Sequence, residues 1–336
     1  MKVVELRGWG LENLVVAERP DPVPGTGQVV VRIRAASLNY RDLLLVRGEY
    51  SPKQKLPIVP CSDGAGEVAA VGAGVTRVRA GDRVCTTFHQ AWLAGEPTRE
   101  RLRASLGSPL DGTLTELLLL DAEGVVAIPE HLSDEEAATL PCAAVTAWNA
   151  LVTEGAVAAG DTVLVQGTGG VSVFALQLGV LLGARVIVTS SSDTKLARAR
   201  DLGAWEGINY REVPAWGVRA RELTGGRGVD HVVEVGGAGT FEQSLQALRP
   251  GGTLSLIGVL AGAALELRLP AIQMRMLRVQ GLLVGHRDSF EAMNRAIAHH
   301  RLRPVVDRVF PLAEARAAFE HVQAGAHFGK VVIRVS

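Results

Sequence analysis

The segment 163–172, VLVQGTGGVS, has the residue types that bind the phosphates of a dinucleotide. Apolar residues run directly into Gly167, Gly169 and Gly170, and a helical pattern starts at once. Glycines let the turn close and let the backbone approach a pyrophosphate, while the helix N-terminus offers unpaired N–H groups and a positive dipole end. The predicted phosphate-binding residues are Gly167, Thr168, Gly169, Gly170 and Val171.

One departure weakens this fingerprint. Its third glycine is replaced by Ser172. The alternative is a tight strand–helix turn that binds nothing. The turn nevertheless lies between a strand and a helix within a repeated strand–helix pattern, which is the context that a dinucleotide site requires.

The end of the next strand predicts which dinucleotide binds. NAD-preferring folds have an acidic residue there that holds the ribose 2′-hydroxyl. Here RVIVT ends in Ser190 and Ser191, and Lys195 follows one turn into the next helix. Hydroxyls and a lysine accommodate a 2′-phosphate, so we expect NADP(H) rather than NAD(H), unless Lys195 is only a solvated surface lysine. Asp193 is the competing acidic candidate, and we expect it to be a helix N-cap.

Two kinds of pattern divide the chain. Residues 1–125 contain short strands punctuated by glycine and proline, which predicts a mostly β unit. From about residue 130, apolar strands alternate with helical stretches, which indicates a parallel sheet covered on both faces. The last 50 residues are helical with a closing strand, and we expect them to fold back onto the first unit.

Composition excludes several classes of protein. Lysine plus arginine equals aspartate plus glutamate at 35 each, so neither nucleic acid nor an anionic membrane is favoured as a partner. Three scattered cysteines and no apolar leader fit a cytoplasmic protein. The uncharged stretch 162–184 contains glycines and glutamines, which favours a strand, a turn and a buried helix over a membrane span.

Longer segments identify a family. The carrying stretches are SLNYRDLLLVRGEY (37–50), LPIVPCSDGAGEVAAVGAGVTRVRAGDRV (56–84), LPCAAVTAWNAL (140–151), VLVQGTGGVS and HFGKVVI (327–333). Together they resemble the medium-chain dehydrogenase/reductase superfamily, and in particular its zinc-free quinone oxidoreductase-like branch. The resemblance implies a GroES-like catalytic domain at 1–128 and 287–336. It also implies a Rossmann cofactor domain at 129–286.

The resemblance also implies further cofactor contacts. Tyr210 would pack against the 2′-phosphate, and Thr146 would touch the nicotinamide. Lys330, near the C-terminus of the chain, would help to bind the cofactor. His286 follows the last Rossmann strand, where a cofactor contact and an ordinary loop histidine are equally expected. We include Val259, which follows another strand of that domain, in the predicted cofactor site.

Zinc ligands are missing from the positions where relatives have them. Zinc members of the family have a cysteine where this chain has Asn39 and a histidine where it has Ser62. Their further ligand matches Cys142, and an acidic neighbour matches Asp63. A catalytic zinc needs about three protein donors of the N, S or O type. We therefore expect no zinc, with Cys142 as a small buried hydrophobe.

Without a metal, hydrogen-bond donors must stabilise the negative charge that hydride transfer leaves on oxygen. Asn39 is the first candidate for orienting substrate. Tyr50 resembles a tyrosine that lines the cleft in zinc-free reductases, where it or water donates the proton, and Asp42 flanks the same segment. The alternative treats Asn39 as a turn residue and Tyr50 as a surface aromatic.

These expectations favour a zinc-independent, NADP(H)-dependent oxidoreductase acting on a quinone, an enone or another activated carbonyl or alkene. An enoyl-thioester reductase and an alcohol or aldehyde dehydrogenase are the enzymatic alternatives. A cofactor-binding structural or RNA-associating protein is the non-enzymatic one. We expect small-molecule substrates, no membrane or nucleic-acid partner, and a homodimer, because the apolar segment RVQGLLVG forms an exposed sheet edge.

Overall fold

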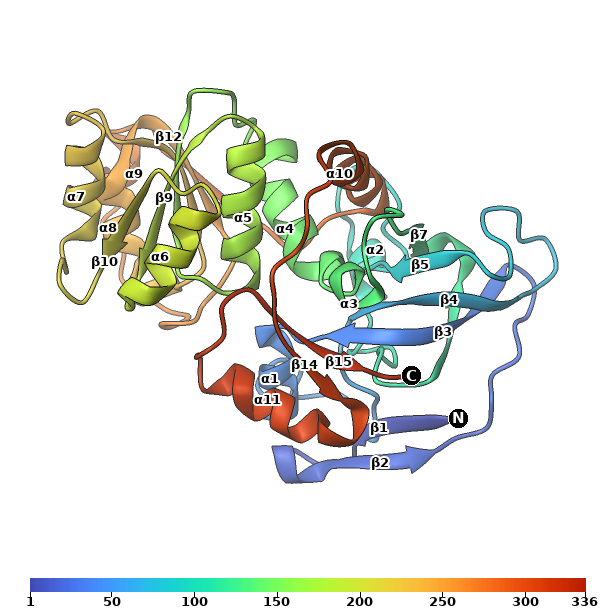
Figure 1. The fold of residues 1–336 in the computed structure, drawn as a ribbon. Coiled ribbons are helices and arrows are strands. Elements are labelled where there is room, and N and C mark those ends of the chain that lie inside the picture. Colours follow the sequence, from blue (N-terminus) through green and yellow to red (C-terminus); the bar gives the residue numbers. More distant parts are fainter. The chain divides into compact units, whose positions relative to one another are not determined.

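The computed structural model describes residues 1–336, which divide into two compact units. Unit 1 comprises Met1–Val145 and Gly285–Ser336, and unit 2 comprises Thr146–Val284. Residues 129–145 and His286, which the sequence prediction assigned to the Rossmann domain, belong to unit 1. Both units combine helices with a sheet (Figure 1), as the predicted α/β class requires.

Unit 1 is built on a seven-stranded sheet in the order β14-β15-β3-β4-β5-β7, with β6 paired to β3, and on the separate hairpin β1-β2. Its strands are β1 (Lys2–Leu6), β2 (Leu14–Glu18), β3 (Gln28–Ser37), β4 (Asp63–Val71), β5 (Arg83–Thr86), β6 (Leu117–Asp121), β7 (Val125–Ala127), β14 (Val306–Pro311) and β15 (Lys330–Arg334). Its helices are α1 (Tyr40–Val46), α2 (Arg99–Arg103), α3 (Asp134–Ala137), α10 (Arg287–His300) and α11 (Ala315–Gln323). Apolar side chains of this sheet, α1 and α11 form a common core.

Strand register in unit 1 brings three distant segments to one place. Ser37, the last residue of β3, lies opposite Asp63, the first residue of β4. On its other side Ser37 lies opposite Val332 of β15, two residues after Lys330. Residues just beyond Ser37 therefore lie beside the starts of both β4 and β15.

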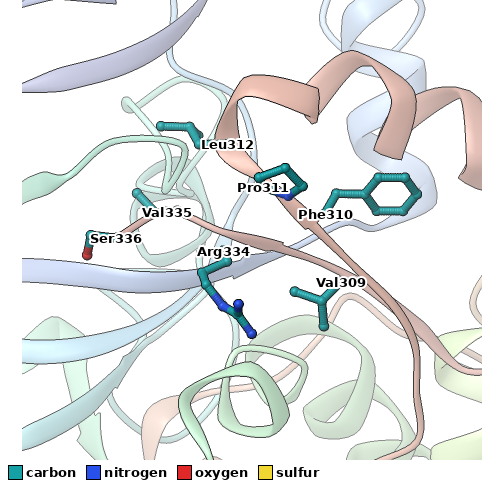
Figure 2. A pocket seen from close by; sticks show the side chains of 7 residues that line it. All are labelled: Val309, Phe310, Pro311, Leu312, Arg334, Val335 and Ser336. Atoms are coloured by element: carbon teal, nitrogen blue, oxygen red, sulfur yellow. The ribbon is translucent and has the colours of Figure 1, made fainter.

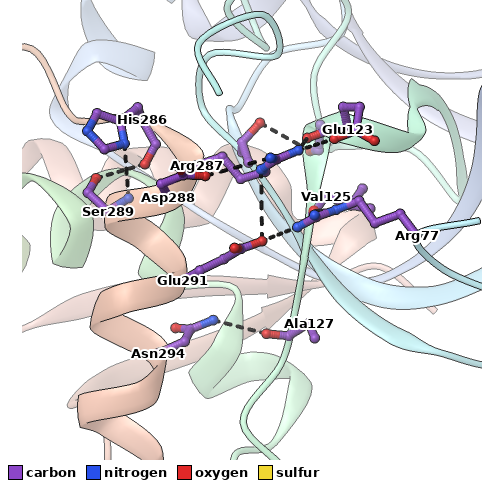
Figure 3. Close-up of polar contacts among 12 residues, drawn as sticks. Arg77, Glu123, Val125, Ala127, His286, Arg287, Asp288, Ser289, Glu291 and Asn294 are labelled. Carbon is purple, nitrogen blue, oxygen red and sulfur yellow. Dashed lines mark hydrogen bonds and ion pairs between the residues drawn. The ribbon is translucent and has the colours of Figure 1, made fainter. Parts of the chain in front are cut away.

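Polar contacts attach the returning helix α10 to β7, to the turn before it and to the connection between β4 and β5 (Figure 3). Arg287 pairs with Glu123, and Arg77 pairs with Glu291. The Asn294 amide donates to the Ala127 carbonyl at 3.0 Å. The C-terminal 50 residues thus fold with the first part of the chain although about 140 residues separate them in sequence.

Unit 2 contains a six-stranded parallel sheet in the order β10-β9-β8-β11-β12-β13. Its strands are β8 (Thr162–Gln166), β9 (Arg185–Ser190), β10 (Glu206–Asn209), β11 (Val229–Glu234), β12 (Leu248–Leu256) and β13 (Arg278–Gly281). Its helices are α5 (Gly170–Leu181), α6 (Asp193–Asp201), α7 (Trp216–Leu223), α8 (Phe241–Ala247) and α9 (Pro270–Gln273), and α4 (Val145–Trp148) lies between two π-helical turns at the unit boundary. This strand order is that of a Rossmann fold, whose ligand lies where the order reverses, here between β8 and β11.

The edge strand β13 is shorter than the sequence pattern predicted. Only Arg278–Gly281 pair with β12, and all four residues are exposed. Gly281 lies opposite Leu256, the last residue of β12, so the ladder ends where its partner strand ends. The prediction of a long apolar edge strand was therefore wrong.

The uncharged stretch 162–184 forms the buried strand β8, the glycine turn and helix α5. No helix combines the length and the apolar character that crossing a bilayer demands.

Candidate active site

The glycine turn of unit 2 joins β8 to α5 and leaves space at the start of the helix. β8 ends at Gln166 and α5 begins at Gly170, with Gly169 as an N-cap that has no side chain to bond the first N–H groups. A Cβ built on Gly167 or Gly169 would meet no atom within 4 Å. Gly167 also has a φ of +70°, which disfavours any other residue. The turn thus has the unfilled N–H groups and the room that a phosphate needs.

Ser172 explains how the chain tolerates the loss of the third glycine. Its side chain is buried, and its hydroxyl donates to the Gln166 carbonyl at 2.6 Å. Serine is small enough for α5 to pack closely on β8, and its buried hydroxyl has a hydrogen-bond partner in the carbonyl at the end of the strand.

The end of β9 has hydroxyls where an NAD site has a carboxylate. β9 ends at Ser190, whose buried hydroxyl accepts from the Ser192 amide at 3.3 Å. The N-cap of α6 is Ser192, which accepts from the Lys195 amide at 3.4 Å. The prediction of Asp193 as N-cap was wrong by one residue, because the serine hydroxyl reaches the free N–H groups and Asp193 accepts from Asn209 at 3.0 Å. Ser191 and Lys195 are half-buried beside this turn.

Other predicted cofactor residues of unit 2 lie at different depths. Tyr210 is exposed, and its amide donates to the Ser190 carbonyl at 3.0 Å, which places it beside the end of β9. Val259 is exposed after β12, whereas Thr146 is buried. Their contacts with a cofactor stay predictions.

The sequence analysis missed a buried carboxylate next to the glycine turn. Glu234 ends β11 and is fully buried. It accepts hydrogen bonds from Gln166 at 2.6 Å, from the amides of Gly236 and Gly237 at 2.8 and 2.9 Å, and from Thr240 at 2.6 Å. Ser244 also donates to it. Glu234 therefore fixes the 235–240 loop against the last residue of β8, and its only signal in the sequence is one acidic residue at the end of an apolar strand.

In unit 1 the strand register assembles Asn39, Asp63 and Lys330. Lys330 is buried, and its Nζ donates to the Leu38 carbonyl at 2.6 Å and to Oδ1 of Asn39 at 2.5 Å. The same Nζ lies 3.9 Å from Oδ2 of Asp63. Burial raises the pKa of Asp63, while Lys330 and the Ser62 hydroxyl, 2.7 Å from Oδ1, oppose that effect.

Lys330 was predicted to bind cofactor. In the structure the partners of its ammonium group lie within unit 1, and the contact with a cofactor stays a prediction. Because Oδ1 of Asn39 accepts from Lys330, the amide Nδ2 is the group left over, and it is buried with no hydrogen-bond partner. Asn39 is thus held by its oxygen, while its Nδ2 has no partner at hydrogen-bond distance but is close enough to Asp63 to oppose the rise in the pKa of that carboxyl.

Asp42 has a structural contact that the sequence prediction did not include. Asn39 is the N-cap of α1, and its backbone amide donates to Oδ2 of Asp42 at 2.8 Å in a capping box. Asp42 is fully buried, and burial raises its pKa to about 6. The alternative interpretation of Asn39 as a turn residue therefore holds for its backbone, and a catalytic role for Asp42 stays a prediction.

Tyr50 lies in an irregular segment after α1 and is 37% exposed. Its ring covers the Arg41 guanidinium, whose carbon lies 4.5 Å from the ring centroid. Cys142 lies in the π-helical turn before α4, and its backbone amide donates to Oδ2 of Asp63 at 3.1 Å. Burial raises the pKa of the Cys142 thiol, which keeps it protonated.

His286 is the N-cap of α10. Its Nδ1 accepts from the Ser289 amide at 3.0 Å (Figure 3), and its ring meets Trp92 edge-on at 5.6 Å. These contacts explain why a histidine stands at this position even if it binds no cofactor. Contact between His286 and a cofactor stays a prediction.

A hollow of about 420 Å³ lies elsewhere on unit 1 and contains none of these residues (Figure 2). It is lined by residues 309–312 and 334–336 of the β14–β15 pair. Its charged member, Arg334, already pairs with Glu135 at 2.9 Å. The candidate site therefore consists of the group formed by Asn39, Asp63 and Lys330 and of the glycine turn, and the hollow is not part of it.

Two family descriptions match this chain. "Alcohol dehydrogenase GroES-like domain" matches residues 25–130, and "Zinc-binding dehydrogenase" matches residues 170–299. A zinc-type alcohol dehydrogenase-like protein of Schizosaccharomyces pombe is 44% identical over 92% of this chain and 91% of its own. The chain belongs to the medium-chain dehydrogenase/reductase superfamily. The predicted GroES-like and Rossmann architecture is thereby confirmed.

Solved structures of this superfamily superimpose over the full chain. An NAD-dependent alcohol dehydrogenase is 37% identical, with a TM-score of 0.92 and all of both chains covered. A mycobacterial protein complexed with NADPH is 29% identical, with a TM-score of 0.83 and 99% of both chains covered. The chain is therefore an oxidoreductase that binds a nicotinamide cofactor.

The superfamily description names zinc, but the residues at the corresponding position do not fit it. Asn39, Ser62 and Cys142 supply one good zinc donor, and no group of three or more histidine, cysteine or acidic side chains is placed to hold a metal. The Lys330 ammonium is bonded to Asn39 and lies near Asp63, so a positive charge is already present. A divalent cation there would meet repulsion as well as too few ligands.

Proposed function

We propose that this oxidoreductase reduces an activated C=C bond, as in an enone or enoyl thioester, or a quinone, with NADPH and without zinc. The observation that supports the proposal most is the pair formed by Lys330 and Asn39. The family resemblance matches this position to a metal ligand of zinc relatives, whereas here an ammonium orients a carboxamide whose Nδ2 has no partner at hydrogen-bond distance.

Bound NADPH would supply a hydride to the acceptor, and Tyr50 or water would supply the proton that completes the reduction. In conjugated acceptors the resulting negative charge moves onto an oxygen, where the Asn39 Nδ2 donates a hydrogen bond to it. One well-placed donor contributes about 3–4 kcal/mol to such a transition state. A negative charge that is delocalised over a conjugated acceptor needs less stabilisation than the localised charge of an alkoxide. A site with hydrogen-bond donors and no Lewis acid therefore suits conjugated acceptors better than it suits simple alcohols.

NADPH is proposed over NADH because of the end of β9. Ser190, Ser191 and Ser192 present no carboxylate to a 2′-phosphate, and Lys195 lies in the first turn of α6. The NADPH-bound mycobacterial relative supports this choice, while the NAD-dependent relative supports the alternative.

A cytoplasmic setting fits three cysteines that are all free thiols.

An alcohol dehydrogenase is the second candidate, since two of the relatives described above are named as such or as similar to such enzymes.

The deciding experiment measures NADPH oxidation with quinones, enones, enoyl-CoA thioesters and aldehydes, and NADP⁺ reduction with primary and secondary alcohols. The proposal expects turnover of an activated alkene or quinone at least tenfold above that of any simple alcohol. Turnover confined to alcohols and aldehydes contradicts it. Firm cofactor binding with no turnover of any acceptor favours a non-enzymatic role.

We also propose a homodimer through the edge strand β13. Val279 in this strand and Leu283 just beyond it are exposed, as are Met274 and Met276 before it. An unpaired strand edge flanked by apolar side chains is stabilised when a second copy pairs with it.

A further inference from the structure

A buried guanidinium in unit 1 lacks the partner that its charge requires. The Arg41 side chain is 9% exposed, and its Nη1 donates to the Leu106 carbonyl at 2.9 Å. Its Nε and Nη2 are both buried and have no partner at hydrogen-bond distance, and the Tyr50 side chain is the one neighbour that raises the pKa of Arg41 as a hydrogen-bond acceptor. A buried donor left unpaired costs about 1–3 kcal/mol, and more when the group is charged.

No nearby carboxylate fills this role. Asp42 is adjacent, but its Oδ1 lies 3.8 Å from Nη1, beyond hydrogen-bond distance, and is itself unpartnered. Oδ2 of Asp42 accepts from the Asn39 amide, which holds the carboxylate in the helix cap. No carboxylate of the chain therefore pairs with the Nε and Nη2 edge of Arg41, and the neutral Tyr50 side chain is its nearest acceptor.

The surroundings of Arg41 keep it charged. The rings of Tyr50 and Phe88 lie 4.5 and 4.7 Å from the guanidinium carbon. Burial lowers the pKa of Arg41, but Tyr50 and Asp42 outweigh it and raise the pKa above its ordinary value. His89 adds no second positive charge, because burial and Arg41 lower its pKa to about 4 and leave the ring neutral.

The unpartnered edge has the shape of one particular ligand. Nε–H and one Nη2–H of a guanidinium lie in its plane and point in parallel from one edge. Two parallel N–H donors bind the two oxygens of a carboxylate in a bidentate pair, which is a strong and directional interaction. Arg41 and Lys330 both lower the pKa of the Cys142 thiol, so both cations lie near this residue, and a carboxylate on Arg41 would bring the rest of its molecule toward the Lys330–Asn39 pair.

We propose that the Nε and Nη2 edge of Arg41 is a carboxylate subsite, so that the substrate is an activated alkene or carbonyl compound that bears a carboxylate. Tyr50 is the exposed member of the group, whereas Phe88, His89 and Leu106 are at most 2% exposed. The carboxylate therefore enters past the Tyr50 ring. The assignment of the reaction rests on the proposed function, but binding of the anion does not.

The test uses calorimetric titration of the full chain at pH 8 with crotonate and with its neutral isostere crotonamide, without turnover. Wild type should bind crotonate at least tenfold more tightly than crotonamide. Arg41→Met should remove that difference, and Arg41→Lys, which keeps the charge but not the two-pronged edge, should retain only part of it. The control Arg47→Met, an exposed arginine at the end of the same helix, should bind as wild type does.

Equal affinity of wild type for the two probes, or unchanged crotonate binding by Arg41→Met, would overturn the subsite. If Arg41→Met does not fold, the wild-type pair of titrations and Arg41→Lys still decide. Inorganic phosphate displacing crotonate at equal concentration would overturn the assignment to carboxylates. Failure of the proposed reduction would appear instead as absent NADPH oxidation with intact crotonate binding.

Discussion

The Lys330 ammonium donates to Oδ1 of Asn39 at 2.5 Å, although 291 residues separate the two in sequence. This bond fixes which end of the carboxamide is available, because the amide nitrogen is the end that remains without a partner. A lysine and an asparagine thus meet where zinc relatives have a metal ligand.

Lys330→Met should reduce both stability and turnover. It leaves Asp63 as a buried carboxylate without its cation, and removal of one partner of such a pair costs about 3–5 kcal/mol. It also releases Asn39, so we expect kcat to fall at least tenfold. Lys330→Arg should restore part of kcat, whereas the exposed control Lys2→Met should leave denaturant unfolding and kcat unchanged. Equal kcat in Lys330→Met and wild type would show that the bond has no role in turnover.

Tyr50→Phe separates a tyrosine that donates the proton from one that only covers Arg41. The phenyl ring still packs on the guanidinium, so affinity for substrate should hold. If the hydroxyl protonates the product, kcat on the true acceptor falls at least tenfold while KM changes little. Unchanged kcat would assign the proton to water.

Gly169→Val tests the glycine turn. A side chain at Gly169 meets no protein atom within 4 Å and the backbone φ is −79°, so the substitution should not destabilise the fold. Its methyl groups would occupy the space proposed for the cofactor phosphates, so we expect NADPH affinity to fall at least tenfold in a fluorescence titration. Gly281→Val is the matched control, because Gly281 in the same unit also faces open space. Similar NADPH affinities for the two variants would place the phosphates elsewhere.

The glycine turn was predictable because its signal is local: strand, glycines and helix follow one another within ten residues. The alternation of strands and helices likewise predicted the parallel sheet of unit 2. The meeting of Lys330 with Asn39 was not, since it depends on β15 pairing with β3. Arg41 gave no signal either, because arginine is usually exposed and only the folded structure shows its unpartnered edge.

Asp42→Asn should change how stability depends on pH. Burial raises the folded-state pKa of Asp42 to about 6 from a reference of 3.8. The folded state therefore keeps a proton that the unfolded state has lost, and this contribution to stability declines as pH rises from about 4 through 6. The decline is about 3 kcal/mol at most. Asparagine keeps the acceptor for the Asn39 amide and does not titrate. The free energy of urea unfolding of Asp42→Asn should therefore rise relative to that of wild type as pH increases across that range. A difference that stays constant from pH 4 to 8 would mean that Asp42 is charged throughout.

Metal content measured together with turnover tests the central claim most directly. Purified protein is analysed for zinc, treated with a strong chelator and assayed for NADPH oxidation with the acceptor that the screen identifies. We predict less than about 0.1 zinc per chain, by the ligand count of the site, and the same kcat before and after chelation. One zinc per chain, with turnover lost on chelation and restored by added zinc, would contradict the account.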